Sequence, residues 1–314
     1  MLRTLIAEPN DFSPEVKKRL NRISQVEEIS SLTQEEFNEA LFEFDIIWFR
    51  LKYHISDISS NKKIKCKYLV CPVTGVNHIS MSFLERNDVK LISLKGEYKF
   101  LSSITPTAEH TVFLTLALLR NSIQAAESVK KGSWDRDRFR GFELNGKRLG
   151  IIGFGRLGKI VAKYFKSFGC EVLINDIKKP LDSDYLYVDS LEEIFNLSDI
   201  ITLHVDLNKS TFKFIDKKIL SSSHGVYLIN TSRGEIVDEN AVLFALKNGN
   251  LKGYASDVVC NEEKGISSSK ILKSHANKDY NTIFTPHIGG CTYESTIKTE
   301  SFVFDKLLKI ITNE

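Results

Sequence analysis

The sequence predicts an α/β protein with two doubly wound parallel-sheet domains. Two observations carry this prediction. Short β-rich runs alternate with helical stretches in two separate series, over residues 1–103 and from residue 148 onward, and such alternation is typical of parallel sheets. The length of 314 residues suits two domains of ordinary size, and 42% hydrophobic and 26% charged residues are usual for a globular protein.

The first series predicts a small five-stranded sheet. Ser13 and Pro14 predict a helix start after the first strand, because serine caps helices and proline is tolerated at the first helical position. Thr33 and Glu36 have the spacing of a capping box at a second helix start. The expected strands are TLIAE (4–8), QVEEI (25–29), DIIWF (45–49), KYLVC (67–71) and KLISL (90–94).

The second series follows a strongly apolar stretch, residues 106–130, which predicts one long helix ending near Gly132. A helical segment over 291–314 lies beyond the series. If it packs on the first domain, residues 1–103 with 291–314 form one domain and residues 104–290 the other, and the chain crosses between them twice. The expected strands are RLGIIG (148–153), EVLIND (171–176), DIITLHV (199–205), GVYLINT (225–231), GYASDVV (253–259) and TIFTP (282–286).

The composition argues against export, a membrane span and a nucleic-acid surface. No apolar run reaches the ~18 residues that cross a bilayer, and the N-terminus lacks the basic region and cleavage site of a signal peptide. Five scattered cysteines suit a reducing cytoplasm. The net charge is +3, and the basic runs EVKKRL (15–20) and NKKIKCK (61–67) lack interleaved aromatics, so we expect solvated surfaces there. No metal site is expected.

Three glycines, Gly153, Gly155 and Gly158, follow the first strand of the second series and open a helix. In that context the first glycine permits a tight turn, the second lets backbone approach a pyrophosphate, and the third lets the helix pack on the sheet. The helix N-terminus adds free N–H groups and the positive end of its dipole. Together with Arg156 and Leu157 between the glycines, the motif predicts a Rossmann dinucleotide-binding turn.

Asp176 ends the next predicted strand, 18 residues after Gly158. A carboxylate at this place accepts hydrogen bonds from ribose hydroxyls, and its charge repels a 2′-phosphate. Lys178 and Lys179 nearby oppose that repulsion. Because of the Asp176 carboxylate we expect NAD rather than NADP. The alternative is that Asp176 only ends a strand and has no role in binding.

Arg233 and His287 each follow a predicted strand of the same sheet, in the segments TSRG and TPHIGG. A lone arginine in a loop is usually only solvated, and a lone histidine is more often structural. At the carboxyl ends of parallel strands beside a nucleotide site, however, both lie where ligands bind. The planar guanidinium of Arg233 suits bidentate binding of a carboxylate.

These motifs resemble the D-isomer-specific 2-hydroxyacid dehydrogenases, including phosphoglycerate dehydrogenases and glyoxylate-hydroxypyruvate reductases. The resemblance extends from Cys71 onward and is looser over the first 65 residues. It implies a Rossmann NAD-binding domain and a smaller flavodoxin-like substrate-binding domain. The segments that carry it are TGVNHI, TAEHTVFLTLALLR, GSWDRDRFRGFELNGKRLGIIGFGRLGKI, LHV, INTSRGEIVDENAV, ASDVVCNEE and TPHIGG.

The resemblance also implies roles for individual residues. Arg233 would bind the substrate carboxylate, and His287 would be the acid/base. Glu262 would pair with His287, although Glu263 beside it stands where the family usually has proline and leaves the choice open. The remaining implied contacts are Asp257 with the nicotinamide amide, Thr231, Val205 and Thr74 along the cofactor, and the backbone of Gly75 with the substrate.

The chain departs from the family pattern at several positions. Val73 stands where many members have glycine, Ser80 where they have aspartate, and Asp206 where they have proline. The segment WFRLKYHIS (48–56) aligns with the family's substrate-facing loop. There Lys52, with Arg50, indicates a substrate with a second anionic or polar end, and an ordinary surface lysine is the alternative.

Three interpretations of function therefore stand. The first is an NAD-dependent enzyme that interconverts a small D-2-hydroxy acid and its 2-keto acid. The second is an NAD(H)-binding sensor or corepressor-like scaffold without significant turnover, because corepressors share this fold. The third is a formate or phosphite dehydrogenase variant, although this chain lacks the longer insertions of formate enzymes. We expect a homodimer, since residues 106–130 and the Trp134 segment resemble the family's dimer-forming elements.

Overall fold

The chain divides into two compact units. A computed structural model describes residues 1–56, 62–180, 184–262, 269–276 and 280–313. Unit 1 comprises Met1–Ile104 and Cys291–Glu314, and unit 2 comprises Thr105–Gly290. In the described part of the chain, no helix combines the length and apolar character that a bilayer span requires.

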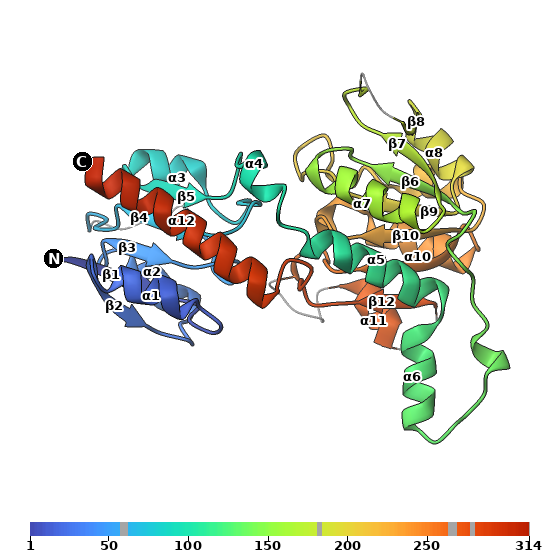
Figure 1. Cartoon of the computed structure of the whole chain (residues 1–314), viewed down its shortest axis with the longest axis horizontal. Coiled ribbons are helices and arrows are strands. Elements are labelled where there is room, and N and C mark those ends of the chain that lie inside the picture. The colour runs from blue at the N-terminus through green and yellow to red at the C-terminus, as the bar shows by residue number, and fades with distance from the viewer. Residues whose placement is uncertain (57–61, 181–183, 263–268, 277–279, 314) are drawn as a thin grey trace. The chain divides into compact units, whose positions relative to one another are not determined.

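Unit 1 contains a parallel sheet with helices on both faces (Figure 1). Its elements are β1 (Leu2–Ile6), α1 (Pro14–Leu20), β2 (Ser24–Glu28), α2 (Gln34–Ala40), β3 (Ile46–Trp48), β4 (Tyr68–Cys71), α3 (Met81–Arg86), β5 (Lys90–Ser93), α4 (Tyr98–Leu101) and α12 (Tyr293–Asn313). The strand order is β2-β1-β3-β4-β5, the flavodoxin-like order. Side chains alternate between the faces: Ile46 and Trp48 join the core of α1 and α12, whereas Ile47 joins the core of α2 and α3.

Both predicted helix starts in unit 1 are confirmed. The Ser13 side chain accepts a hydrogen bond from the backbone N–H of Val16. Thr33 and Glu36 form the reciprocal capping box of α2. A side-chain cap of this kind stabilises a helix by about 1 kcal/mol.

Unit 2 contains a seven-stranded parallel sheet among its described residues. Its elements are α5 (Pro106–Leu119), α6 (Ser122–Lys130), the 3-10 turn η1 (Asp137–Phe139), β6 (Arg148–Ile152), α7 (Arg156–Ser167), β7 (Glu171–Asn175), β8 (Leu186–Tyr187), α8 (Leu191–Leu197), β9 (Ile200–Leu203), α9 (Lys217–Ser221), β10 (Val226–Asn230), the 3-10 turn η2 (Gly234–Ile236), α10 (Glu239–Lys247), β11 (Leu251–Ser256), α11 (Lys270–Ala276) and β12 (Thr282–Phe284). The order β12-β11-β10-β9-β6-β7-β8 reverses between β6 and β9. In such sheets ligands bind outside the carboxyl ends of the strands at this reversal, so the predicted doubly wound fold is confirmed.

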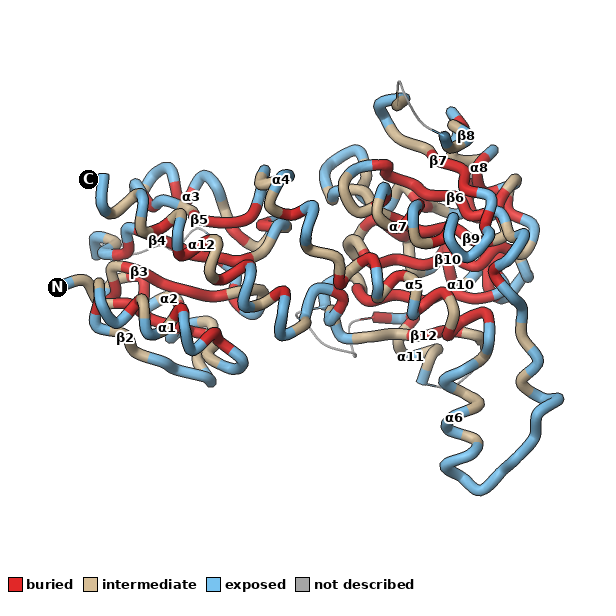
Figure 2. The backbone as a smooth tube through the Cα atoms, in the orientation of Figure 1, coloured by how far each residue is buried: buried red, intermediate tan, exposed pale blue. Residues whose placement is uncertain are grey.

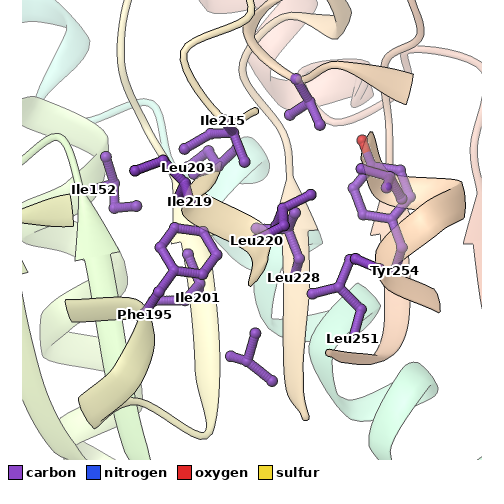
Figure 3. Packing of buried hydrophobic residues seen from close by; sticks show 14 of the residues in the cluster. Ile152, Phe195, Ile201, Leu203, Ile215, Ile219, Leu220, Leu228, Leu251 and Tyr254 are labelled. Atoms are coloured by element: carbon purple, nitrogen blue, oxygen red, sulfur yellow. The ribbon is translucent and has the colours of Figure 1, made fainter. Parts of the chain in front are cut away.

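The central strands of unit 2 are buried from both sides, as Figure 2 shows by their red colour, whereas the edge strand β8 has no buried residue. Helices α5 and α7 cover one face through residues such as Leu118 and Phe165. Helices α8 to α11 cover the other face, where Phe195, Leu220 and Leu228 pack together (Figure 3). These two layers make the sheet a rigid support for the loops at its carboxyl edge.

The prediction of one long helix over 106–130 is wrong. Helix α5 ends at Leu119, and α6 begins at Ser122. Asn121 between them adopts a left-handed conformation with φ of +51°, which asparagine tolerates better than most residues. The new axis carries α6 away from the sheet (Figure 1), and none of its residues is buried.

Strand β8 was also not expected from the sequence. It consists of only two residues, Leu186 and Tyr187, and pairs in parallel with β7 at the edge of the sheet. A strand of this length has no alternating pattern that a sequence can display.

Candidate active site

The three residues expected to carry chemistry follow three neighbouring strands of unit 2. Arg233 follows β10, Glu262 follows β11, and His287 follows β12. These strands pair in parallel, β10 with β11 and β11 with β12. Their carboxyl ends therefore lie along one edge of the sheet, the edge where ligands bind in this architecture.

His287 and Glu262 form a direct side-chain pair. The His287 Nδ1 atom lies 2.6 Å from Glu262 Oε1. A carboxylate can only accept a hydrogen bond, so Nδ1 carries the proton and donates it. Nε2 is then the nitrogen left for exchanging a proton with a ligand. Glu263, the alternative partner, lies outside the described residues.

The turn that carries His287 is held by Asp257 at the end of β11. The Asp257 backbone carbonyl accepts the N–H of His287 at 2.8 Å. Its carboxylate accepts the N–H groups of Ile288 at 2.9 Å and Gly289 at 2.7 Å, and the hydroxyl of Thr285 at 2.6 Å. His287 has a left-handed φ of +55°, a strained conformation that persists only where its surroundings fix it.

The charged state of Asp257 is stabilised although the residue is buried. Burial acts to raise the pKa of Asp257, but hydrogen bonds from His110, Thr285, Gly289 and Ile288 outweigh burial and leave the pKa below its ordinary value. Oδ1 accepts hydrogen bonds from Thr285 and Ile288 and lies 3.4 Å from His110 Nε2, whereas Oδ2 accepts one from Gly289 and has two lone pairs. Acceptor capacity for the nicotinamide amide, the role that the resemblance implies, therefore remains on Oδ2.

The Arg233 turn is shaped by Asn230, the last residue of β10. The Asn230 side chain accepts hydrogen bonds from the N–H and hydroxyl of Ser232 and donates to the Arg233 carbonyl at 2.9 Å. The next residue is Gly234, where an added Cβ would lie 2.0 Å from the Val259 carbonyl carbon. Only glycine therefore lets the loops after β10 and β11 approach so closely.

Toward the described residues, the Arg233 guanidinium uses one of its nitrogens and leaves its other donors for a ligand. One nitrogen donates to the Ser232 carbonyl at 2.6 Å. A guanidinium carries five N–H donors, so a second edge is available for an anion. Arg233 is half-buried, which strengthens charge-assisted hydrogen bonds relative to those in open water.

The segment before Glu262 is also held by Glu235, close after Arg233, and by Glu239 at the start of α10. Glu235 accepts the N–H of Asn261 at 3.1 Å, and Glu239 accepts the N–H of Cys260 at 3.2 Å. Residues near Arg233 therefore set the position of the residues next to Glu262.

The glycine turn has the features that a bound pyrophosphate requires. Gly153 has φ of +93°, and an added Cβ there would lie 2.5 Å from the His204 carbonyl oxygen. At Gly158 an added Cβ would lie 2.1 Å from the Gly153 carbonyl oxygen, so both glycines are needed for the fold itself. An added Cβ at Gly155 meets nothing within 4 Å. The space over Gly155 is thus open to a ligand, and among the described residues no side chain caps the first turn of α7, which Arg156 and Leu157 begin.

Three further residues expected to contact the cofactor follow strands β7, β9 and β10 of the same sheet. Asp176 follows β7, accepts the N–H of Phe154 at 2.7 Å and so fixes the glycine turn. Val205 follows β9 beside Gly153. Thr231 follows β10 and exchanges a hydrogen bond with Thr111 at 2.9 Å. This arrangement fits an NAD molecule at the reversal of the strand order.

The structure places Lys52, Thr74 and Gly75 in unit 1, after the neighbouring strands β3 and β4. Lys52 is exposed, and its Nζ lies 5.0 Å from the centre of the Tyr53 ring. Thr74 is exposed and Gly75 is half-buried. All three therefore lie at the carboxyl edge of the unit 1 sheet.

Arg50 does not provide the second positive charge that the sequence indicated. Its guanidinium pairs with Glu300 of α12 at 2.6 Å and donates to the Asn10 carbonyl. Glu300 is fully buried, and burial raises its pKa although Arg50 and the Ser13 N–H act against this. Because Arg50 is neutralised inside unit 1, the case for a second anionic substrate group depends on Lys52.

Sequence reasoning missed the supporting residues, notably His110, Thr285, Asn230 and Glu235. Each contacts a site residue or a close chain neighbour of one. The positions of Thr285, two residues before His287, and of Asn230 and Glu235, close to Arg233, were the only available signals. His110 lies 175 residues before its partner Thr285, and no feature of the sequence connects the two.

Comparisons with known proteins agree with this geometry. The family described as D-isomer specific 2-hydroxyacid dehydrogenase, NAD binding domain, matches residues 112–289. This match spans more than half of the chain. The chain belongs to this family. Residues 112–289 are accordingly its NAD-binding domain, and NAD is its cofactor.

The relatives in this family include dehydrogenases and reductases. A D-3-phosphoglycerate dehydrogenase of Methanocaldococcus jannaschii is 31% identical over 100% of this chain and 58% of its own length. A hydroxypyruvate reductase of Thermotoga maritima is 31% identical over 88% of each chain. A D-lactate dehydrogenase of Aquifex aeolicus, solved with NAD and lactic acid, is 26% identical, with a TM-score of 0.81 over 99% of this chain and 96% of that one. The chain thus spans little more than half the length of the Methanocaldococcus relative.

Substitutions at two glycines of the turn should separate binding from folding. In Gly155→Ala we expect an unchanged melting temperature and about tenfold weaker NADH binding, because the added methyl group enters only the space over the turn. In Gly158→Ala we expect about 1–3 kcal/mol lower stability, because the methyl group collides with the Gly153 carbonyl. Thermal melts and NADH fluorescence titrations measure the two effects. Unchanged NADH affinity in Gly155→Ala would show that no pyrophosphate lies over this position.

Proposed function

We propose that this chain is an NAD-dependent oxidoreductase that interconverts a D-2-hydroxy acid and its 2-keto acid. Arg233 binds the substrate carboxylate, and His287, paired with Glu262, exchanges a proton with the oxygen on C2. The observation that carries the proposal is the 2.6 Å pair between His287 and Glu262, placed at the strand edge that also carries Arg233 and the glycine turn.

The protein's own groups account for binding and proton transfer. Bound NADH supplies the hydride that reduces C2 of the keto acid. Arg233 fixes the substrate by its carboxylate, which limits how the carbonyl can point. Protonated His287 donates from Nε2 to the carbonyl oxygen, while Glu262 holds Nδ1 and balances the ring's charge. In the oxidative direction neutral Nε2 accepts the hydroxyl proton.

A panel of 2-keto acids, each with NADH and with NADPH, tests this proposal. The panel contains pyruvate, glyoxylate, hydroxypyruvate and 3-phosphohydroxypyruvate. We expect oxidation of NADH with at least one of them and slower oxidation of NADPH, because Asp176 repels a 2′-phosphate. Tight NADH binding without turnover on any acid would instead support the sensor or scaffold.

Lys52 would contact the far end of the substrate, together with backbone at Gly75. Its exposed ammonium follows β3, so a polar or anionic group at that end is favoured over a methyl group. Within the panel we therefore expect hydroxypyruvate or its phosphorylated analogue to be reduced with a lower KM than pyruvate. We also propose a cytoplasmic location, and the five free cysteine thiols are consistent with the reducing conditions there.

We further propose that the chain forms a homodimer through α6 and the segment that follows it. Several apolar side chains in this part of the chain are exposed: Ile123, Val129, Trp134 and Phe142 are 38%, 50%, 89% and 51% exposed. Contact with a second copy would remove this apolar surface from water. In light scattering we expect twice the 35.7 kDa chain mass. The double variant Val129→Asp, Trp134→Asp should approach the single mass, and Tyr98→Asp, an exposed control in unit 1, should not. A wild-type protein at the single mass would refute the dimer.

A further inference from the structure

His110 of α5 belongs to a hydrogen-bonded chain of three side chains that ends at the catalytic turn. His110 Nε2 lies 2.9 Å from the Thr285 hydroxyl oxygen. That hydroxyl donates to Asp257 Oδ1 at 2.6 Å. His110 Nε2 also lies 3.4 Å from the same carboxylate oxygen. Nothing in the proposed chemistry uses His110 directly.

The direction of each hydrogen bond in this chain follows from the donors available. Thr285 has one hydroxyl hydrogen, and Asp257 takes it. The Thr285 oxygen can then only accept from His110. His110 must therefore carry a hydrogen on Nε2, and it donates toward a carboxylate through one intervening hydroxyl.

The far end of the chain holds His287 in place. Asp257 accepts the N–H groups of three consecutive residues, His287 through its carbonyl and Ile288 and Gly289 through its carboxylate. An added Cβ on Gly289 would lie 2.8 Å from Asp257 Oδ2 and 3.5 Å from the His110 ring, so the turn is packed against both side chains. The strained φ of His287 depends on these contacts.

We infer that His110 is a positioning residue for the acid/base His287, acting through Thr285 and Asp257. Its donated hydrogen fixes the Thr285 hydroxyl, which then points at Asp257 rather than rotating. The carboxylate so oriented keeps the 287–289 turn in its strained form. The expected effect on kcat rests on the proposed function, whereas the expected effect on the shape of the 287–289 turn does not.

Paired variants test this inference. His110→Leu removes the donor, and His110→Gln keeps an N–H donor on a side chain of similar reach. In His110→Leu we expect amide hydrogen exchange in the peptide over residues 285–290 to accelerate about tenfold. The buried Thr285 hydroxyl loses one hydrogen bond, and such a loss typically has an effect of this size. In His110→Gln we expect near wild-type exchange. On any keto acid that the protein reduces, kcat should fall about tenfold in His110→Leu with NADH affinity unchanged, and should recover in His110→Gln.

The exchange measurement does not depend on turnover, so it stays decisive if no keto acid is reduced; that result would overturn only the proposed function. Thr285→Val, with Thr285→Ser as its matched control, provides the same test if His110→Leu fails to fold. His224→Leu, at an exposed histidine of unit 2, should change neither exchange nor kcat. Unchanged exchange over 285–290 in both His110→Leu and Thr285→Val, or equal acceleration in His110→Leu and His110→Gln, overturns the inference.

Discussion

Replacing His287 with alanine should lower kcat by about 10²–10⁴-fold while NADH still binds, because general acid/base catalysis typically contributes this much. In the proposed mechanism the imidazole moves the proton at the C2 oxygen, and the variant leaves only water to do so. The glycine turn after β6 and Asp176 are untouched by the change. NADH affinity, which depends on them, should therefore stay close to that of the wild type.

Stopped-flow turnover and NADH titration of His287→Ala check this expectation. His224→Ala provides a matched control, because His224 is an exposed histidine of the same unit. It should keep full turnover. If His287→Ala kept near wild-type kcat, His287 would not be the acid/base, and the pair with Glu262 would be only structural.

Replacing Arg233 with alanine should raise KM for the keto acid and lower kcat, with kcat/KM falling on the order of 10²-fold or more. The loss has two parts. The substrate carboxylate loses its charged partner, and the carbonyl is no longer held in one orientation. Arg233→Lys keeps the positive charge but lacks the planar guanidinium. Its kcat/KM should therefore lie between the values of the wild type and Arg233→Ala.

Steady-state kinetics over a range of keto-acid concentrations measures both constants. Arg120→Ala, at an exposed arginine that follows α5, is the control and should change neither of them. Wild-type values of KM and kcat in Arg233→Ala would remove Arg233 from carboxylate binding.

The sequence predicted the sheets well because both are buried by helices on two faces. Apolar runs such as those at 45–49 and 225–231 therefore stand out from the polar helices around them. The helix break at Asn121 was missed because apolar periodicity continues across it, and only the left-handed φ of one residue ends α5. The two residues of β8 were too few to form a pattern.

The arrangement of the candidate site was predictable where a residue directly follows a strand at the carboxyl edge of the sheet, as for Arg233, His287 and Gly155. It was not predictable where distant parts of the chain meet. The Arg50–Glu300 pair joins residues 250 apart. Because of this pair, an arginine that was expected to support an anionic substrate group is bound to a buried carboxylate of unit 1 instead. His110 acts only through Thr285 and Asp257, so its own surroundings in the sequence show nothing of its role.

The fate of a deuterium label tests the central claim most directly. The protein is incubated with a keto acid that it reduces and with NADH deuterated at the transferable position, and the product is examined by mass spectrometry and chiral chromatography. We predict one deuterium on C2 of a product with the D configuration. A product without deuterium on C2, an L product, or no reduction of any keto acid in the panel would contradict the account.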